Sequence, residues 1–195
     1  MAVISIFGKI DKRILVFPLI RAYSMTGQTI VITDDGCFKN LYHTSGSTGE
    51  IDGVKIMVIN DLPPDLSKIT QEYQNVIYVL SDMAELPADN TLVCHGEDKT
   101  MIRGGTRGTE KNNKDKSITD IYLRMAPIKT KEIQIILKPY YYRYLVETEE
   151  KKELLVLKDK KICQLLSKTC SNAVGMKEAQ FYMLLLRKRY EISKK

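Results

Sequence analysis

Short apolar runs alternate with amphipathic runs along the first half of the chain. The apolar runs are rich in β-branched residues and are continuous rather than alternating with polar positions. Continuous apolar strands are typical of a parallel sheet that is covered on both faces. The intervals between them leave room for the crossover connections that parallel strands need. The expected strands are residues 2–7, 29–33, 54–59, 75–80, 91–94 and 132–137.

Helical spacing of apolar residues marks the segments between and after these strands. Residues 11–25 form the first expected helix, and Pro18 inside it should kink the helix or shift its start. Further helices are expected over residues 67–73, 154–169 and 179–190, and irregular loops over residues 42–53 and 97–120.

These elements predict one α/β domain over residues 1–195, with a doubly wound, mostly parallel, Rossmann-like sheet flanked by helices. Within it, residues 97–120 are expected to be a flexible loop, and residues 179–195 a C-terminal basic amphipathic helix.

Length and composition agree with one water-exposed domain. The chain has 195 residues, of which 44% are hydrophobic and 28% charged. No apolar run reaches the roughly 18 residues that span a bilayer. The first apolar run precedes its charges, the reverse of a secretory signal, so we expect a cytoplasmic protein. The net charge of +6 permits contact with nucleic acid or an anionic membrane surface without requiring it.

Few residues have the character of metal ligands. The four cysteines form no CxxC pair, and His43 and His95 have no second histidine or cysteine nearby in the sequence. We therefore expect buried reduced thiols and no metal centre of cysteine or histidine.

Charged residues gather where three of the expected strands end. Residues 8–13 (GKIDKR) follow the first strand, Asp34 and Asp35 follow the second, and residues 60–64 (NDLPP) follow the third. The carboxyl ends of parallel strands form the edge of an open sheet where ligands bind. Each group also has a purely structural interpretation. Asp34-Asp35-Gly36 would form an ordinary turn, Asp61 would cap the chain where it leaves the sheet, and residues 9–13 would be the solvated start of a helix.

The order of these segments resembles the MinD/ParA family of P-loop ATPases. The similar segments are VISIFGK, a helix, IVITDD, IMVINDLPPDLS and NVIYVLSDM, and they cover about residues 2–95. The resemblance implies a P-loop NTPase fold. It also implies that Asp61 corresponds to the Walker-B aspartate, and that Asp34 or Asp35 supports the metal and the attacking water.

The same resemblance implies a phosphate loop at the start of the first helix. Gly8 and Lys9 are similar to its opening Gly-Lys, and Lys12 then corresponds to the lysine on the β- and γ-phosphates. If nucleotide binds, Asp34 and Asp61 are the expected magnesium ligands.

The loop nevertheless departs from the family pattern. Ile10 and Asp11 stand where glycines should let backbone amides crowd around phosphate, and Arg13-Ile14 replaces the hydroxyl pair. A carboxylate 4 Å from a phosphate charge costs roughly 4 kcal/mol at an effective dielectric constant of 20. The sequence therefore predicts a degenerate Walker A loop and a pseudo-ATPase without a cofactor.

Three functions follow from this reading. The first is a non-catalytic scaffold or regulatory subunit that binds a protein partner, as a homodimer or as a heterodimer with an active ATPase. The second is an atypical ATPase with weak binding of ATP and Mg²⁺. The third is a DNA-binding partition or transfer accessory protein, with residues 103–108 as candidate phosphate contacts.

The C-terminal segment and an aromatic run are candidate contact surfaces. Leu184, Leu185, Arg187, Lys188 and Arg189 would contact a peripheral membrane surface or a partner, since residues 183–195 hold five Lys/Arg and one Glu. The alternative is that this helix docks on its own domain or forms a dimer. Residues 140–144 (YYYRY) would stack on nucleic-acid bases, or pack against a neighbouring helix or partner.

Overall fold

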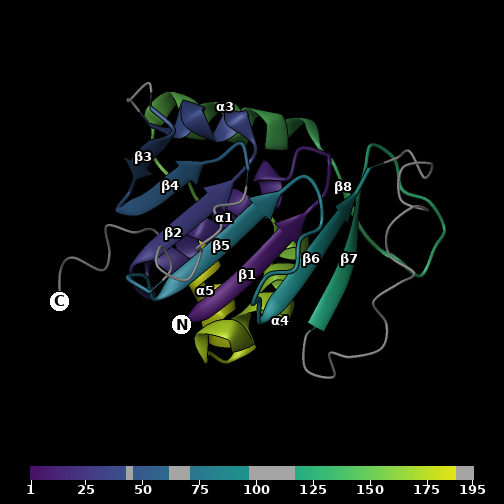
Figure 1. The fold of residues 1–195 in the computed structure, drawn as a ribbon. Helices are drawn as coiled ribbons and strands as arrows, with labels where there is room; N and C mark the ends of the chain where they lie inside the picture. Colours follow the sequence, from purple (N-terminus) through teal and green to yellow (C-terminus); the bar gives the residue numbers. More distant parts are fainter. Residues whose placement is uncertain (43–45, 62–70, 97–116, 188–195) are drawn as a thin grey trace.

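A computed structural model describes residues 1–42, 46–61, 71–96 and 117–187. Its centre is an eight-stranded sheet in the order β3-β4-β2-β5-β1-β6-β7-β8 (Figure 1). All neighbouring strands are parallel except β3 and β4, which are antiparallel. The strands are β1 Ala2–Phe7, β2 Thr29–Thr33, β3 Thr48–Ile51, β4 Val54–Val58, β5 Asn75–Leu80, β6 Asn90–His95, β7 Ser117–Arg124 and β8 Ile133–Ile136.

The larger hydrophobic core lies between one face of the sheet and the helices. It joins alternate residues of the central strands to the apolar sides of α1, α3, α4 and α5. The helices are α1 Arg13–Ser24, α3 Pro139–Lys151, α4 Lys160–Cys170 and α5 Glu178–Leu186, with short 3-10 helices η1 Gly36–Leu41 and η3 Ser171–Val174. The helix α1 begins at Arg13, so Pro18 lies in its interior.

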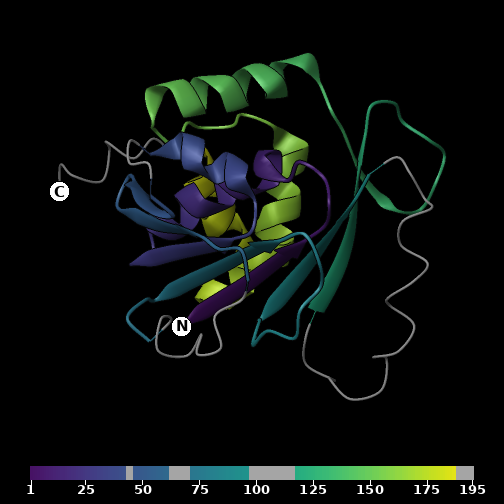
Figure 2. The same ribbon diagram turned by 45° about the horizontal axis from the view of Figure 1, so that its top comes forward.

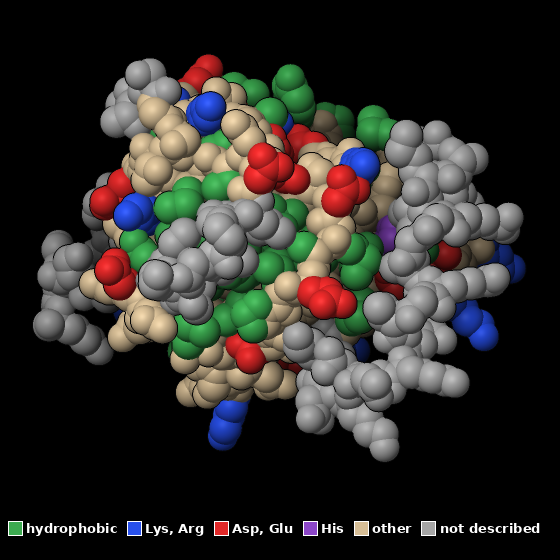
Figure 3. Space-filling view, in the orientation of Figure 1, with side chains coloured by type: hydrophobic (Ala, Val, Ile, Leu, Met, Phe, Trp, Pro, Cys, Tyr) green, Lys and Arg blue, Asp and Glu red, His purple; other side chains and the backbone are tan. Residues whose placement is uncertain are grey.

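A second, smaller core covers the other face of the sheet. Strand residues such as Phe7, Ile32 and Tyr78 pack there against Leu86 and Ala88, and no described helix contributes to it. Figure 3, which views this face, shows hydrophobic side chains over the strands with acidic side chains around them. The predicted mostly parallel α/β fold is thus confirmed.

The helix α3 crosses the end of the molecule to which the parallel strands point (Figure 2). Near its C-terminus, Glu149 pairs with Arg13 at the start of α1, and the Lys152 ammonium donates to the Asn40 carbonyl oxygen. Near its N-terminus, the hydroxyls of Tyr140 and Tyr141 donate to Asp159. The contacts at its two ends therefore hold α3 at the carboxyl end of the parallel strands.

Several expected elements differ from the observed ones. Among the strands and α-helices, three differ from expectation: β3 lies inside the expected loop 42–53, β7 begins within the expected loop 97–120, and α3 forms where the sequence indicates only an aromatic run. The helix α4 begins six residues later than expected because Leu154 and Leu157 are buried in an extended segment. Three expected segments lie wholly or mostly outside the described residues. They are most of the helix expected over 67–73, nearly all of the loop expected over 97–120 (residues 97–116), and residues 188–195 of the C-terminal segment.

Candidate functional site

The turn after β1 requires glycine. Gly8 has φ +137°, and a Cβ atom built on it would lie 2.2 Å from the carbonyl oxygen of Cys94 in β6. The Gly8 amide donates to the Leu80 carbonyl oxygen at the end of β5, at 3.1 Å. Gly8 therefore lies tightly between the two strands that flank β1.

The two lysines of this turn point to different partners. Lys12 precedes α1 and is 2% exposed, and its ammonium donates to the carbonyl oxygens of Gly8, at 2.5 Å, and Ile10, at 3.5 Å. Lys9 instead forms an exposed ion pair with Asp82, which follows β5, at 2.9 Å. Lys12 thus donates its hydrogen bonds to carbonyl oxygens of its own turn.

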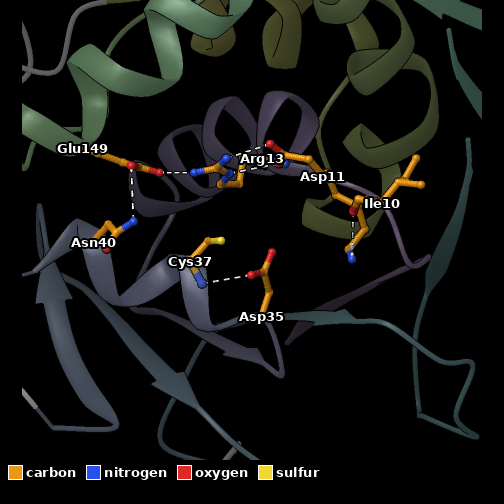
Figure 4. Close-up of polar contacts among 8 residues, drawn as sticks. Ile10, Asp11, Arg13, Asp35, Cys37, Asn40 and Glu149 are labelled. Carbon is orange, nitrogen blue, oxygen red and sulfur yellow. Dashed lines mark hydrogen bonds and ion pairs between the residues drawn. The ribbon is translucent and has the colours of Figure 1, made fainter.

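A carboxylate of the chain occupies the N-terminus of α1. Asp11 accepts from the Arg13 amide at 3.0 Å and from the Arg13 guanidinium at 2.9 and 2.7 Å. Burial raises the pKa of Asp11, but these bonds from Arg13 outweigh it, so the pKa lies below its ordinary value. The other side of the guanidinium bonds Glu149 of α3, which also accepts from Asn40 at 3.4 Å (Figure 4).

The two aspartates after β2 make backbone contacts. Both Asp34 carboxylate oxygens accept from the Ser81 amide, at 2.8 and 3.1 Å, which ties the end of β2 to the end of β5. Asp35 accepts from the Cys37 amide at 2.9 Å and so caps η1 (Figure 4). In this arrangement both carboxylates hold turns together.

Asp61 lies apart from the other predicted residues. It follows β4, and β2 and β5 lie between β4 and β1. Three strand spacings place it roughly 14 Å from the β1 turn along the sheet. The structure therefore does not bring Asp61 next to Gly8 and Lys12, and the acidic residue beside that turn is Asp82.

Sequence reasoning missed Asp82 and Glu149. Asp82 lies near the end of the run NVIYVLSDM, but only the spatial order of the strands shows that β5 is the neighbour of β1. Glu149 lies far from residues 8–13 in the sequence, and no signal in the chain links them. Both residues neutralise cations of the turn after β1.

These contacts leave little room for a nucleotide. Each of Lys9, Lys12 and Arg13 already has a partner within the protein, and the first amide of α1 is bonded to a carboxylate. No group of three histidine, cysteine, aspartate or glutamate side chains that could hold a metal occurs among the described residues. The residues present do not fit a magnesium-bound triphosphate, which needs donors on the phosphates and oxygen ligands on the metal.

Comparisons with known proteins support the fold. No family model matches the chain, and no curated protein matches it. Among solved structures, it is similar to a chain of the MinC:MinD cell division protein complex of Aquifex aeolicus. The TM-score is 0.53 and the identity 13%, over 100% of this chain and 97% of that chain. The fold is MinD-like.

The C-terminal helix of this MinD-like fold docks on its own domain. Phe181 and Leu185 are fully buried, and the Phe181 ring meets Tyr23 of α1 edge-on at 5.7 Å. The buried Arg21 guanidinium donates to the carbonyl oxygens of Leu184, Leu185 and Arg187 at the end of α5. Leu185 is therefore a core residue, and its prediction as a surface contact is wrong.

The other predicted surface residues differ in exposure. Leu184 is half-buried and Arg187 exposed, whereas Lys188 and Arg189 lie outside the described residues. In the aromatic run, Tyr141 and Tyr144 are buried and Tyr142 is 73% exposed. The run therefore mainly packs α3 onto the domain. No helix among the described residues has the length and apolar character needed to cross a membrane.

Proposed function

We propose that this protein is a non-catalytic MinD/ParA-like scaffold or regulatory subunit that binds a protein partner. The supporting observation is the self-bonded turn after β1. Its buried lysine faces carbonyl oxygens, and Asp11 and Glu149 hold its arginine. A triphosphate would have to displace two carboxylates and reverse the direction of Lys12 before it could bind.

The partner is a protein, either a second copy or an active ATPase of the same fold. The similar solved structure is described as a complex of two cell division proteins, MinC and MinD, and that description motivates the proposal here. We propose that the protein is cytoplasmic, with a peripheral contact at the membrane as the alternative.

An atypical ATPase is the second candidate. The tight turn at Gly8 and the burial of Lys12 favour it, because a turn that approaches an anion closely needs a glycine and a nearby cation. In that case Lys12 would contact phosphate. Of the two predicted magnesium ligands, Asp34 would lie nearer to the turn after β1, because β2 is closer to β1 than β4 is.

Calorimetry with ATP and Mg²⁺ on the whole chain separates the two. The scaffold proposal expects no heat of binding and no phosphate release, with Lys12→Ala indistinguishable from the natural chain. The exposed Lys55→Ala variant controls for loss of a positive charge. Micromolar binding or turnover that is lost in Lys12→Ala and kept in Lys55→Ala would replace the scaffold with the ATPase.

A further inference from the structure

Positive charge gathers around α4, which packs on the side of the sheet opposite the face in Figure 3. Residues 154–177 contain five lysines, no arginine and one acidic residue, so this segment carries +4 of the chain's net charge of +6. The face in Figure 3 instead has acidic side chains around its hydrophobic centre. The five lysines are all exposed, and they are Lys158, Lys160, Lys161, Lys168 and Lys177.

Helical geometry places three of these lysines on one side of α4. At 3.6 residues per turn, Lys160, Lys161 and Lys168 lie within an arc of about 100°, and they extend about 12 Å along the helix. The opposite side of α4 is buried in the larger hydrophobic core. Lys158 is exposed directly before the N-cap residue. We refer to Lys158, Lys160, Lys161 and Lys168 as the α4 lysine surface.

The one acidic residue of the segment does not neutralise this surface. Asp159 is buried, and its oxygens accept from the Ile162 amide and from two tyrosine hydroxyls. Its ion pair is with Lys138 at the start of α3. No residue in the described part of the chain forms an ion pair with the α4 lysine surface. The positive charge on the outward side of α4 is therefore uncompensated.

The position of two of these lysines adds to the unfavourable charge distribution. The first turn of a helix lies at the positive end of its dipole, which disfavours nearby cations. Lys160 and Lys161 occupy the first turn of α4, and that turn contains no acidic residue. By contrast, the first turn of α5 contains Glu178. Anionic groups bound at the α4 lysine surface would relieve this repulsion.

Protein carboxylates fit the α4 lysine surface better than a bilayer or a nucleic acid does. The exposed residues of α4 are three lysines and Gln164, so the helix exposes no apolar side chain for insertion into a bilayer. Nucleic-acid phosphates are matched best by arginine, which bonds two oxygens at once, and residues 154–177 contain only lysines. A lysine ammonium is a point charge on a flexible stem, and it pairs with a single carboxylate without a fixed geometry.

We infer that the α4 lysine surface binds an acidic, flexible segment of a partner protein. The surface offers charge without apolar anchors, and blocks of like charge are typical of disordered interaction tails. Exposed ion pairs are individually weak and are screened by salt, so the affinity comes from several pairs together. The inference rests on the proposed scaffold function and names the chemistry of the partner.

The test uses the whole chain and two labelled peptides of equal length, followed by fluorescence anisotropy. One peptide alternates glutamate with serine, and the other alternates glutamine with serine. The glutamate peptide should bind at low salt, and the glutamine peptide should not. Because the contacts are exposed charge pairs, the affinity should fall by roughly tenfold or more between about 20 mM and 200 mM salt.

Charge reversal on α4 has a matched control elsewhere in the chain. Lys161→Glu combined with Lys168→Glu should weaken binding of the glutamate peptide by about tenfold or more. Lys129→Glu combined with Lys131→Glu changes the net charge equally, at exposed lysines between β7 and β8. This control should weaken binding by less than about twofold, because those lysines lie outside the α4 lysine surface. Circular dichroism of both double variants checks that the fold is retained.

Three outcomes overturn the inference. The first is equal binding of the two peptides, or no binding of either. The second is an equal loss in the two double variants, which would show that only the net charge of the chain matters. The third is tighter binding of duplex DNA or of phosphatidylserine vesicles than of the glutamate peptide, lost on charge reversal of Lys161 and Lys168. That result would make the surface a contact for nucleic acid or for membrane.

Calorimetry with ATP and Mg²⁺ keeps this inference apart from the proposed function. ATP turnover together with peptide binding that depends on Lys161 and Lys168 would remove the scaffold function and leave the α4 lysine surface. Absent ATP binding together with absent peptide binding would leave the scaffold and remove the acidic partner at α4.

Discussion

Removing the Asp159 carboxylate should loosen α3 from the domain. One oxygen caps α4 by accepting from the Ile162 amide at 3.0 Å. The other accepts from the hydroxyls of Tyr140, at 2.5 Å, and Tyr141, at 2.8 Å. In Asp159→Ala the lost cap costs about 1 kcal/mol. The Tyr141 hydroxyl, in a side chain that is 4% exposed, loses its acceptor at a further cost of about 1–3 kcal/mol. The free energy of unfolding should fall by roughly 2–4 kcal/mol.

Urea unfolding followed by circular dichroism measures this change. The matched control is Asp35→Ala, which removes a capping carboxylate that accepts from the Cys37 amide in its turn and from no tyrosine hydroxyl among the described residues. That variant should lose about 1 kcal/mol. Equal losses in the two variants would show that the tyrosine hydroxyls do not hold α3, and the reasoning from these contacts would be refuted.

The same carboxylate makes the difference depend on pH. Burial alone raises the pKa of Asp159, but the bonds from Tyr140, the Ile162 amide and Tyr141 outweigh it and hold the pKa well below its ordinary value. A depressed folded-state pKa adds stability above the ordinary value of about 3.9, and this stability is lost as the pH falls toward the folded-state pKa. The gap between the natural chain and Asp159→Ala should therefore be constant near neutrality and shrink below about pH 4. A gap that widens on acidification would contradict this sign.

Three further changes test other contacts. Gly8→Ala should lower the melting temperature, because the new methyl group would collide with the Cys94 carbonyl oxygen and residue 8 has a positive φ. The expected strain is roughly 1–3 kcal/mol. An unchanged melting curve would contradict the tight turn. Arg21→Leu should make α5 the first part of the chain to be cleaved in limited proteolysis, because the carbonyl oxygens at the end of α5 lose their donor. Uniform cleavage would argue that the Arg21 hydrogen bonds do not hold α5. Asp82→Asn should change stability by less than about 0.5 kcal/mol, because its ion pair with Lys9 is exposed, and a larger loss would show coupling that the geometry lacks.

The central strands of the sheet could be predicted from the sequence, whereas β3 and β7, at and near its edges, could not. Strands β1, β2 and β5 are buried on both faces, so their apolar runs are continuous and easily recognised. Strand β7 (SITDIYLR) lies nearer the edge, where polar residues are tolerated, and its start merges with a polar stretch. The helix α3 begins with proline and three tyrosines, which have modest helix propensity, so tertiary packing determines its structure.

The sequence placed Gly8, Lys12 and Asp34 at one edge of the sheet but did not reveal their partners. Gly8, Lys12 and Asp34 lie at the carboxyl edge because the strand ends place them there. Strand order decides which acidic residue is their neighbour, and nothing local records that β5 lies beside β1. The bond from Arg13 to Glu149 likewise depends on the path of α3 across the edge.

The contacts of Arg21 and Tyr23 in α1 with α5 have a consequence for synthesis on the ribosome. Arg21 and Tyr23 are translated long before their partners at Leu184 and Phe181. Until then, a guanidinium and an aromatic ring destined for the interior stay in contact with water. The nascent chain therefore cannot complete its native interior before α5 has emerged from the ribosome, and it should depend on chaperones that shield it until then.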